Sequence, residues 1–447
     1  MIRDDDSVGS VLARDAGIFM GFDAFDHDLH GGDLLALAPF VFGRGDARHS
    51  NGAELPGTLK WDYVQRYYFD HNATTPIAPE VYEALVSCLS QVYGNASSIH
   101  FFGQGAKRQL EAARRLVASL IHANPAEVVF TSGGTEADNI AVLGVVRATG
   151  HSSPHVITTA IEHPAVLGPC AQLGREGAAV TVLRVGASGV VNADDVRNAL
   201  RPDTALVSIM HANNELGTVQ PIADIARITR EAGVPLHVDG VQALGKMPVD
   251  VEALGVDLYS MSGHKIYAPK GVGALYVRKG TRMAPISFGG HHERDRRPGT
   301  ENVPCAGAFG AAAQLAAERL TEDANRQAVL RDRLENAILD RIPGTGINGA
   351  RWSRVPNTSN IYFDGIDGEA LVIALDLRGF AVSTGAACSS GALAPSHVLT
   401  AMGLSADRAR ASMRFSLGRG TTTEQVDALV EAIGASVNHL RRISAHA

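Results

Sequence analysis

Hydrophobic and polar positions divide the middle of the chain into short apolar segments separated by segments with helical spacing. A segment such as 223–232 repeats its apolar residues every three or four positions, whereas the apolar segments contain few polar residues. Strands that are apolar at almost every position are typical of a mainly parallel sheet covered on both faces by helices. The pattern therefore predicts an α/β domain. Its strands are expected at 127–132, 155–160, 179–185, 205–211, 235–240, 258–264 and 273–279.

The pattern changes in the last third of the chain. Long helical stretches follow Asn302, strands are predicted at 360–365 and 380–385, and a closing helix is predicted at 423–442. We expect a second, smaller α+β domain there. Before the sheet, helices are predicted at 79–93 and 107–121.

The first 66 residues have a different texture. They contain 11 acidic and 6 basic residues and show poor helical periodicity, so we expect a weakly ordered extension or a small appended element. A start codon assigned too far upstream would also explain such a stretch. Residues 23–33 gather aspartate and histidine side chains, but they lack the fixed ligand spacing of a metal motif. We predict a solvated acidic segment and no metal site.

Composition narrows the class of protein. The 447 residues are 45% hydrophobic and 19% charged, with a net charge of −7, which is typical of two or three globular domains and excludes wholesale disorder. The chain has no excess of positive charge for nucleic acid or an anionic membrane. Its four cysteines are scattered, and the longest early apolar run, at 34–42, is too short to span a bilayer. We expect a cytoplasmic protein that binds neither nucleic acid nor membrane.

The most informative segment places Lys265 in a polar, glycine-rich turn after a predicted strand. Most lysines are simply exposed, but here Ser262 and His264 offer donors for a phosphate within reach of the amine. Upstream, Asp239 ends another apolar strand. A lysine that forms a Schiff base, together with a carboxylate for a pyridinium nitrogen, is what a protein contributes to pyridoxal phosphate chemistry.

Two further segments support this interpretation. In FTSGGTEADN a strand runs through Gly134 and Thr135 into a helix, and the N-terminus of a helix binds phosphate through its free N–H groups. The second segment places His163 between an apolar strand and a proline. An isolated histidine is usually structural, but a flat imidazole that titrates near neutral pH can also cover a planar cofactor.

Together these segments resemble the cysteine desulfurases, a branch of the class V pyridoxal-phosphate enzymes of fold type I. The resemblance runs from Tyr67 to the C-terminus. It is carried, in the order of the family, by the motifs YFDHNATTP, GNASSIH, TSGGTEADN, EHPAV, MHANNELGTVQPI, HVDGVQALGK, SGHKIYAPKGVGALYVR, RPGTEN, STGAACSSG and MRFSLGR.

The resemblance implies a domain division and a cofactor. Residues 1–66 would be an extension of unknown role, and 67–315 the cofactor-binding large domain, with 67–80 starting the small domain. Residues 316–447 would be the small domain that carries the catalytic cysteine loop. The cofactor would be pyridoxal 5'-phosphate.

The resemblance also implies roles for individual residues. Lys265 would bind the cofactor covalently, Asp239 its ring nitrogen and Gln242 its ring hydroxyl, while His163 would stack on the ring and take part in proton transfer. The phosphate would be held by Gly134, Thr135, Ser262, His264 and, from the other subunit of a homodimer, Thr300. The substrate, L-cysteine, would be bound by Asn95, Asn214 and Arg414.

The sulfur acceptor implied by the family is Cys388, which small and hydroxyl residues surround. Such a segment cannot bury the thiol, so an accessible loop is expected, and a nucleophilic thiol needs that access. The family's reaction converts L-cysteine to L-alanine and leaves a persulfide on Cys388. That sulfur would pass to a partner such as an iron–sulfur scaffold or another sulfur carrier protein.

Departures from the family pattern are modest. Gly240 stands where alanine is expected, and Ala386 and Ala394 flank the Cys388 loop where serine and glutamate are common. Two other functions remain open. A selenocysteine lyase or related lyase would share the lysine site but would have less need of Cys388. A non-catalytic assembly subunit should have lost Lys265 or Cys388, and both are present. Absorbance, sulfide release and alanine release separate the three.

Overall fold

A computed structural model describes residues 65–385 and 395–444 of the chain. The chain divides into two units, Met1–Asp62 and Tyr63–Ala447, and all of the described residues belong to the second. The predicted extension, including the acidic stretch at 23–33, lies outside the described residues, and so does Cys388.

A seven-stranded sheet forms the centre of the larger part, in the order β2-β8-β7-β6-β5-β3-β4. Neighbours from β7 to β4 pair in parallel, whereas β8 is antiparallel to both β7 and β2. The predicted mainly parallel α/β sheet is therefore confirmed. The strands are β2 (Val128–Thr131), β3 (His155–Thr159), β4 (Ala179–Leu183), β5 (Thr204–Ser208), β6 (Leu236–Asp239), β7 (Leu258–Ser262) and β8 (Gly273–Val277).

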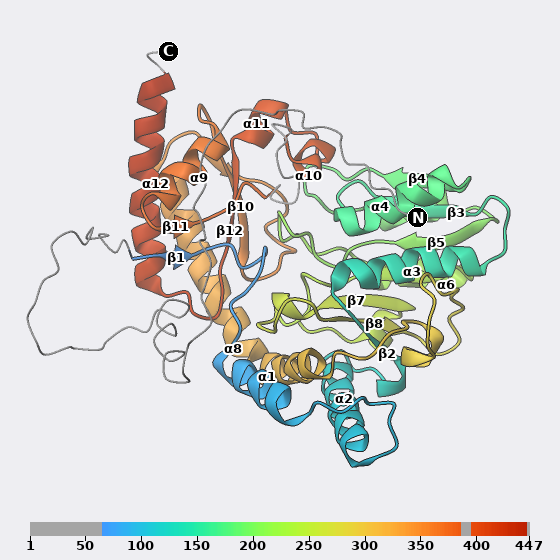
Figure 1. Ribbon diagram of the computed structural model, residues 1–447. Coiled ribbons are helices and arrows are strands. Elements are labelled where there is room, and N and C mark those ends of the chain that lie inside the picture. The colour runs from blue at the N-terminus through green and yellow to red at the C-terminus, as the bar shows by residue number, and fades with distance from the viewer. Residues whose placement is uncertain (1–64, 386–394, 445–447) are drawn as a thin grey trace, which may run out of the picture. The chain divides into compact units, whose positions relative to one another are not determined.

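Helices surround this sheet, and Figure 1 shows α3 lying over the strands. Several helices begin where a side chain accepts an otherwise unpaired backbone N–H: His100 does so for α2, and Asn302 for the long α8. The helices of this part are α1 (Pro79–Gln91), α2 (Phe101–Leu120), α3 (Gly134–Ala148), α4 (Pro164–Arg175), α5 (Ala193–Ala199), α6 (Ile222–Glu231), α7 (Val251–Leu254) and α8 (Val303–Arg341), with 3-10 turns η3 (Pro125–Glu127), η4 (Gly263–Lys265) and η5 (His292–Asp295).

Successive residues of a strand point to opposite sides of the sheet, and on both sides they are buried in apolar clusters, except in the edge strand β4, where only Leu183 is buried. Val156 of β3 packs in an apolar cluster with α3 and α4, while its neighbour Ile157 packs in another with α2, α6 and α8. Val129 and Phe130 of β2 divide in the same way. This double burial explains why the strands contain so few polar positions.

A second, smaller sheet is antiparallel, in the order β12-β10-β9, and a parallel pair joins β1 to β11. Its core contains Phe69, Phe363 and Phe415 together with apolar residues of α8, α9 and α12. The elements are β1 (Tyr67–Tyr68), β9 (Thr345–Ile347), β10 (Thr358–Phe363), α9 (Gly368–Asp376), β11 (Phe380–Ala381), α10 (His397–Ala401), α11 (Ala406–Arg410), β12 (Ser412–Ser416) and α12 (Thr423–Ser444).

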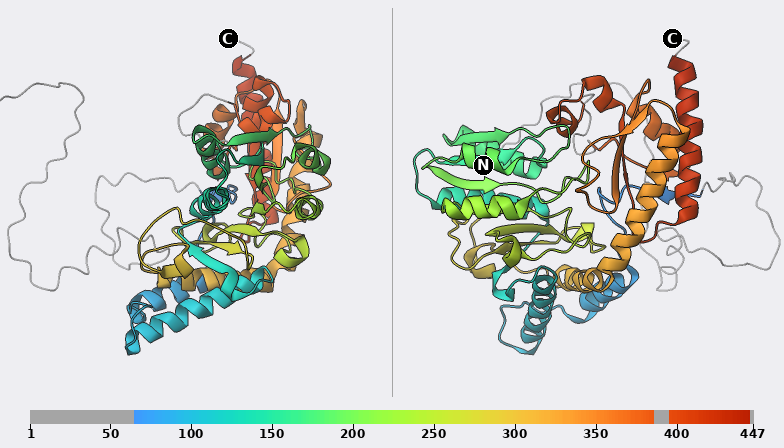
Figure 2. Two further views of the ribbon diagram at one scale, coloured as in Figure 1. Left: turned by 90° about the vertical axis from the view of Figure 1, so that its right-hand side faces the viewer. Right: turned by 180° about the vertical axis from the view of Figure 1, so that it is seen from behind.

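Helix α8 connects the two cores. Its first half packs in the cluster beneath the larger sheet, and its second half, from Leu330 to Ile338, packs in the core of the smaller one. Figure 2 shows its course from the region of α1 and α2 to α12. The predicted boundary between 315 and 316 falls inside this helix. Among the described helices, none combines the length and the apolar composition needed to cross a membrane.

Candidate active site

Several predicted site residues follow the C-terminal ends of strands in the larger sheet. Asp239 is the last residue of β6 and Ser262 the last of β7, His163 comes just before α4, and Gly134 begins α3 after β2. The C-terminal ends of parallel strands meet at one edge of a sheet, where open α/β sheets bind their ligands. Gly134 lies directly against this edge, because a Cβ built on it would come within 2.7 Å of Val241 Cγ2 and 3.5 Å of Ser262 Cβ.

Lys265 is held at the end of η4 by the segment that follows β1. Its Nζ donates to the carbonyl oxygens of Asn72, at 2.6 Å, and Ala73, at 2.7 Å. The backbone N–H and the hydroxyl of Thr75 both donate to the carbonyl of His264 at 3.0 and 2.9 Å. These bonds fix the amine between the end of β7 and residues 72–75.

His264 lies beside the same segment. One ring nitrogen, Nδ1, is 3.1 Å from Thr74 Oγ1. Burial, followed by the charges of Lys265 and Lys270, lowers the pKa of His264 to about 4. The ring is therefore neutral at pH 7, where it can offer an N–H as a hydrogen-bond donor without carrying a charge.

The start of α3 is tied to the RPGTEN segment by Glu136. This carboxylate accepts the backbone N–H of Ser132 and, 3.1 Å away, Nε of Arg297. An acidic residue is also favourable in the first turn of a helix because of the helix dipole. The exposed Thr300 belongs to the same segment as Arg297. The loop predicted to bind phosphate and the loop that carries Thr300 are therefore neighbours.

Three carboxyl groups are buried near the end of β6. The pKa of Asp239 is raised to about 7. Burial is the largest cause, the charge of Asp138 raises the pKa further, and the charge of His163 lowers it in part. Burial likewise raises the pKa of Asp138 to about 7 and that of Glu162 to about 8. Asp138 Oδ1 lies 3.5 Å from His237 Nε2, whose own pKa burial lowers to about 4. The site therefore holds buried carboxyl groups with little compensating positive charge.

His163 has a defined orientation. Its Nδ1 accepts the backbone N–H of Ala165 at 3.1 Å, so the ring caps the N-terminus of α4. Since Nδ1 accepts, a proton on the neutral ring belongs to Nε2. Burial lowers the pKa of His163, the charge of Asp239 raises it, and the charge of Lys265 lowers it. The ring therefore lies within electrostatic reach of both residues.

Arg414 and Asn214 also meet at this edge. The guanidinium Nη1 donates to the carbonyl oxygen of Asn214 at 3.0 Å, and Nη2 pairs with Asp70 Oδ1 at 2.6 Å. The buried Nε has no hydrogen-bond partner. Arg414 reaches the site from β12 of the smaller sheet, so both sheets contribute residues.

Two predicted residues are not joined to this group. Within the described residues, no hydrogen bond or ion pair links Asn95 or Thr300 to the other predicted site residues; Asn95 Oδ1 instead accepts the backbone N–H of Ser97 at 2.8 Å. Gln242, in contrast, is joined, because its Nε2 donates to the carbonyl of Asn72 at 3.0 Å. Thr135 lies in the first turn of α3.

Asn72 and Lys246 were missed as site residues by sequence reasoning. Asn72 binds Lys265, Gln242 and Lys246 through its two oxygens. It belongs to the YFDHNATTP motif, but no local pattern shows that it meets residues about two hundred positions away. Lys246 follows Gln242 by four residues, which is the spacing of side chains one helical turn apart. That signal was available.

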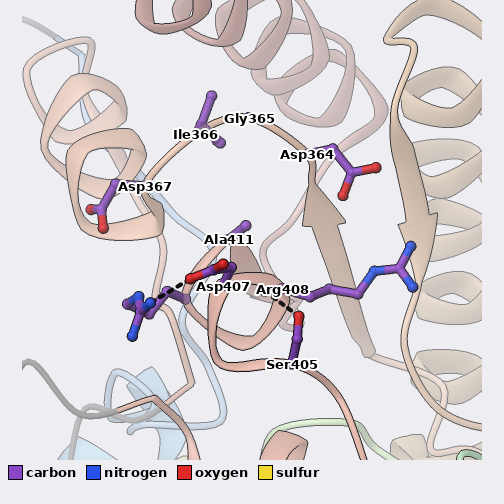
Figure 3. A pocket seen from close by; sticks show the side chains of 9 residues that line it. Asp364, Gly365, Ile366, Asp367, Ser405, Asp407, Arg408 and Ala411 are labelled. Carbon is purple, nitrogen blue, oxygen red and sulfur yellow. Dashed lines mark hydrogen bonds and ion pairs between the residues drawn. The ribbon is translucent and has the colours of Figure 1, made fainter. Parts of the chain in front are cut away.

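A separate hollow lies beside the smaller sheet (Figure 3), with a volume of about 500 Å³. Asp407 and Arg410, which form an ion pair, belong to its lining, and Figure 3 shows a further carboxylate from Asp364. It contains none of the residues predicted for the site. The group around Lys265 is therefore the better candidate for catalysis.

Comparison with known proteins agrees with the geometry. The aminotransferase class-V family matches residues 67–429. A cysteine desulfurase from Trichormus azollae is 47% identical over 377 residues, which cover 84% of this chain and 94% of the relative. This chain belongs to the cysteine desulfurases of the aminotransferase class-V family.

Solved structures of the family have the same fold. A NifS-like protein superposes with a TM-score of 0.79 at 37% identity, covering 84% of this chain and all of the other. The protein SspA, solved in complex with cysteine, superposes with a TM-score of 0.71 at 36% identity, covering 78% of this chain and 98% of the other. The class-V enzymes use pyridoxal phosphate, and this desulfurase is a pyridoxal-phosphate enzyme of fold type I.

The residues at the strand ends fit that cofactor. Asp138 Oδ1 and Glu162 Oε2 are buried without a hydrogen-bond partner, so this region would be stabilised by a cationic ring N–H. At the start of α3, a Cβ added to Gly133 would meet no atom within 4 Å, which leaves open space where an anion can approach free backbone N–H groups. Both observations match the two charged ends of pyridoxal phosphate.

Proposed function

We propose that this desulfurase uses Lys265 to hold pyridoxal phosphate and Cys388 to take up the sulfur of L-cysteine, with L-alanine as the other product. The observation that carries the proposal is the placement of Lys265 Nζ at the end of β7, against the carbonyls of Asn72 and Ala73. Asp239 ends β6, which pairs directly with β7. A reactive amine and a buried carboxylate therefore face the same edge of the sheet.

The cofactor would be held by residues from several strand ends. Asp239 would accept a hydrogen bond from the ring nitrogen, and His163 would cover the ring. Pyridoxal phosphate supplies an electron sink for the carbon that loses its proton. Donors to the phosphate would be Gly134, Thr135, Ser262, His264 and, from a second copy, Thr300.

Asp239 and Lys265 divide the proton handling. A cation beside Asp239 would favour its ionised form and oppose the effect of burial on its pKa. Lys265 Nζ would take the proton from the substrate carbon once the amine is released from the cofactor. His163 Nε2 would carry the proton of the neutral ring and exchange it, because Nδ1 accepts the Ala165 N–H.

The substrate would be oriented by Arg414 and Asn214. The guanidinium uses two of its nitrogens on Asn214 and Asp70 and keeps Nε without a partner. A planar guanidinium fork matches a carboxylate better than a single ammonium does. We also propose that Asn95 contacts the substrate. It would have to approach Arg414 and Asn214 from the segment between α1 and α2.

Sulfur transfer would be carried out by the Cys388 thiolate. The thiolate attacks the substrate sulfur, so that an S–S bond forms as the C–S bond breaks. The electron pair of the C–S bond remains with the carbon, which is protonated to become the methyl group of alanine. Two-electron oxidation of the two sulfur atoms is thereby balanced by reduction of the carbon, and no other oxidant is required.

A second copy of the chain would complete the site. The helices α1 and α2 expose large apolar side chains near their junction, including Ile99, of which 93% is exposed, and Phe101, of which 78% is exposed. An apolar patch on a soluble enzyme is typical of an interface. We propose a homodimer in which Thr300 serves the neighbouring phosphate site.

The persulfide would be passed to a sulfur acceptor protein. Relatives of this chain carry the names IscS and NifS-like protein, and we propose an iron–sulfur scaffold or another sulfur carrier as the partner. A cytoplasmic location would suit this role, because Cys388 must return to a thiol after each transfer and the cytoplasm keeps thiols reduced.

The experiment that tests the proposal compares Cys388→Ser with the parent. The variant should bind L-cysteine, seen as a change in the absorbance of the cofactor, but release essentially no alanine and carry no persulfide, because a hydroxyl is a poor nucleophile toward sulfur. Cys305→Ser is the matched control and should keep the parent rate. If Cys388→Ser desulfurates cysteine at the parent rate, Cys388 is not the acceptor and the enzyme is a lyase.

A further inference from the structure

Lys246 is a buried lysine to which the proposed reaction assigns no role. Its Nζ donates to Asn72 Oδ1 at 2.8 Å and to Gln242 Oε1 at 2.5 Å. No carboxylate lies within ion-pair distance of this amine in the part of the chain that the structure describes. Burial, then the charges of Lys265 and Arg414, lowers the pKa of Lys246. Burying an amine that is bound only by amide oxygens lowers the stability of the fold. We therefore expect Lys246 to contribute to the function of the site.

The amide of Gln242 can take only one orientation between its two neighbours. Its Oε1 accepts from Lys246, and its Nε2 donates to the carbonyl oxygen of Asn72 at 3.0 Å. A carbonyl oxygen can only accept, so a flipped amide would bring two oxygens together. The Nε2 group carries two N–H bonds, and the second remains available to a ligand. Gln242 therefore presents a donor, not an acceptor, to the site.

The partner of Lys246 is also fixed. Asn72 Oδ1 accepts a second hydrogen bond from Asn357 at 3.1 Å, while Asn72 Nδ2 donates to Thr358 Oγ1 at 2.9 Å and to the carbonyl of Asn214 at 3.1 Å. Every polar atom of the Asn72 side chain is used. The acceptor that holds Lys246 therefore cannot rotate away without breaking several bonds.

We propose that Lys246 is a positioning residue that acts through Gln242: it locks the Gln242 amide so that an N–H faces the cofactor's ring oxygen and holds that oxygen in its anionic form. This inference rests on the proposed cofactor site around Lys265. An N–H donor stabilises the anionic form of the ring oxygen by a hydrogen bond. An amide oxygen turned toward the ring could only accept, so it would favour the protonated hydroxyl.

The charges around Lys246 also favour the anionic form of the ring oxygen. The positive or neutral groups that face it are Lys265, Arg414 and His71, whose pKa burial lowers to about 4. Lys246 also lines a cavity of about 20 Å³ with Lys265, Asp323 and Arg419. In that cavity, Asp323 Oδ2 is paired with Arg419 Nε at 2.8 Å, so its negative charge is compensated.

Two further titratable side chains near Lys265 are His163 and His264. Burial and the charge of Lys265 lower the pKa of both, while the charge of Asp239 raises that of His163. The charges that act on the pKa of Lys246 are thus those of Lys265 and Arg414, both positive.

The test is the absorbance spectrum of the purified, cofactor-loaded chain, since an anionic ring oxygen gives visible absorbance and a protonated one absorbs in the near ultraviolet. Lys246→Met keeps the aliphatic stem but removes the donor to Gln242 Oε1, so that only the bond to the Asn72 carbonyl still orients the amide. The ratio of visible to near-ultraviolet absorbance at pH 7 should fall at least threefold, and the cofactor should dissociate about tenfold faster, the effect of one hydrogen bond. Lys270→Met is the control, which removes an exposed lysine near the same turn and should match the parent.

A second pair of variants separates positioning from general stabilisation. In a Gln242→Ala background, Lys246→Met should change neither the absorbance ratio nor the cofactor dissociation rate further, because the lysine would have no amide to hold. Equal effects in both backgrounds would overturn the inference. If Lys246→Met does not fold, Gln242→Glu decides: it keeps a partner for Lys246 but presents only oxygens, so the visible band should be lost. A spectrum like the parent's would overturn the inference.

The outcomes also distinguish this inference from the proposed function. A parent chain that binds no pyridoxal phosphate, or binds it away from Lys265, contradicts the proposed function itself. A parent chain labelled on Lys265, with a spectrum that Lys246→Met leaves unchanged, contradicts only the role of Lys246.

Discussion

Arg414 Nη2 lies 2.6 Å from Asp70 Oδ1, so the arginine proposed to bind the substrate carboxylate already has an anionic partner. Asp70 follows β1 at the start of the described chain, and Arg414 lies in β12 near its end. The ion pair fixes the guanidinium with Nη1 on the Asn214 carbonyl. We therefore predict that substrate binding needs the planar shape of the guanidinium at this position, and that a positive charge alone is not enough.

Arg414→Lys should raise the KM for L-cysteine about tenfold or more, because an ammonium cannot replace the planar fork. The absorbance of the bound cofactor should stay as in the parent. Steady-state kinetics with Arg410→Lys as control, an exposed arginine paired with Asp407, checks this. An unchanged KM in Arg414→Lys would remove Arg414 from substrate binding.

Asp239→Asn should lower kcat by about 100-fold or more while cofactor remains bound. The amide cannot stabilise a protonated ring nitrogen as a carboxylate does, so the electron sink is weakened. Cofactor content by absorbance and alanine release by chromatography measure the two effects separately. Asp407→Asn, on the surface, should behave as the parent. Normal turnover in Asp239→Asn would mean that this carboxylate does not face the ring.

Glu162→Gln should stabilise the cofactor-free chain relative to the parent, increasingly so as the pH rises. Burial raises the pKa of Glu162 to about 8 from an ordinary value of 4.5. The folded state therefore binds this proton more tightly than the unfolded state, and the contribution is fully present below pH 4.5 and lost as the pH rises toward 8. The loss is about 1.4 kcal/mol per pH unit.

Glutamine imitates the protonated acid, since its Oε1 can still accept from Thr159 Oγ1 and the Met210 N–H, as Glu162 does. Denaturant unfolding at pH 5 and pH 8 gives the comparison, with the exposed Glu322→Gln as control. A difference between Glu162→Gln and the parent that stays constant with pH would show that Glu162 is ionised in the folded chain.

Gly240→Ala should destabilise the chain, although the resemblance to the family led us to expect alanine at this position. A Cβ at residue 240 would lie 1.9 Å from Tyr259 Cε1. The Tyr259 ring is fully buried, and its hydroxyl bonds His211 Nδ1 at 2.9 Å, so it cannot move aside freely. Overpacking of this kind costs about 1–3 kcal/mol.

Thermal unfolding measures this cost. Gly434→Ala is the matched control, because a Cβ there meets no atom within 4 Å in α12, and alanine is the better helix former. The smaller side chain of Tyr259→Leu should recover part of the stability lost in Gly240→Ala. Equal melting temperatures for Gly240→Ala and the parent would contradict the packing described.

Local patterns were enough to predict much of the fold. The inner strands of the larger sheet are apolar because both of their faces are buried, so they stood out in the sequence, and the apolar edge strand β4 stood out as well. The antiparallel direction of β8 left no such signal, since burial is the same for either direction. Strand β12 was missed because Arg414, which we propose as a substrate-binding residue, interrupts its apolar run.

The candidate site divides in the same way. Asp239 and Lys265 could be predicted because each follows a strand end, and strand ends of a parallel sheet meet. The contact between Lys246 and Asn72 joins residues 174 positions apart, and nothing in either segment specifies the other. Such contacts depend on how the smaller sheet packs, which a pattern of hydrophobic positions does not fix.

The most direct test of the account is to locate the cofactor on the chain. The purified protein is treated with borohydride, which makes the lysine–cofactor bond permanent, and is then digested and sequenced by mass spectrometry. The account predicts loss of the visible absorbance and one pyridoxyl group per chain, on Lys265. A pyridoxyl group on Lys246 or Lys270 instead, or none on any lysine, would contradict it.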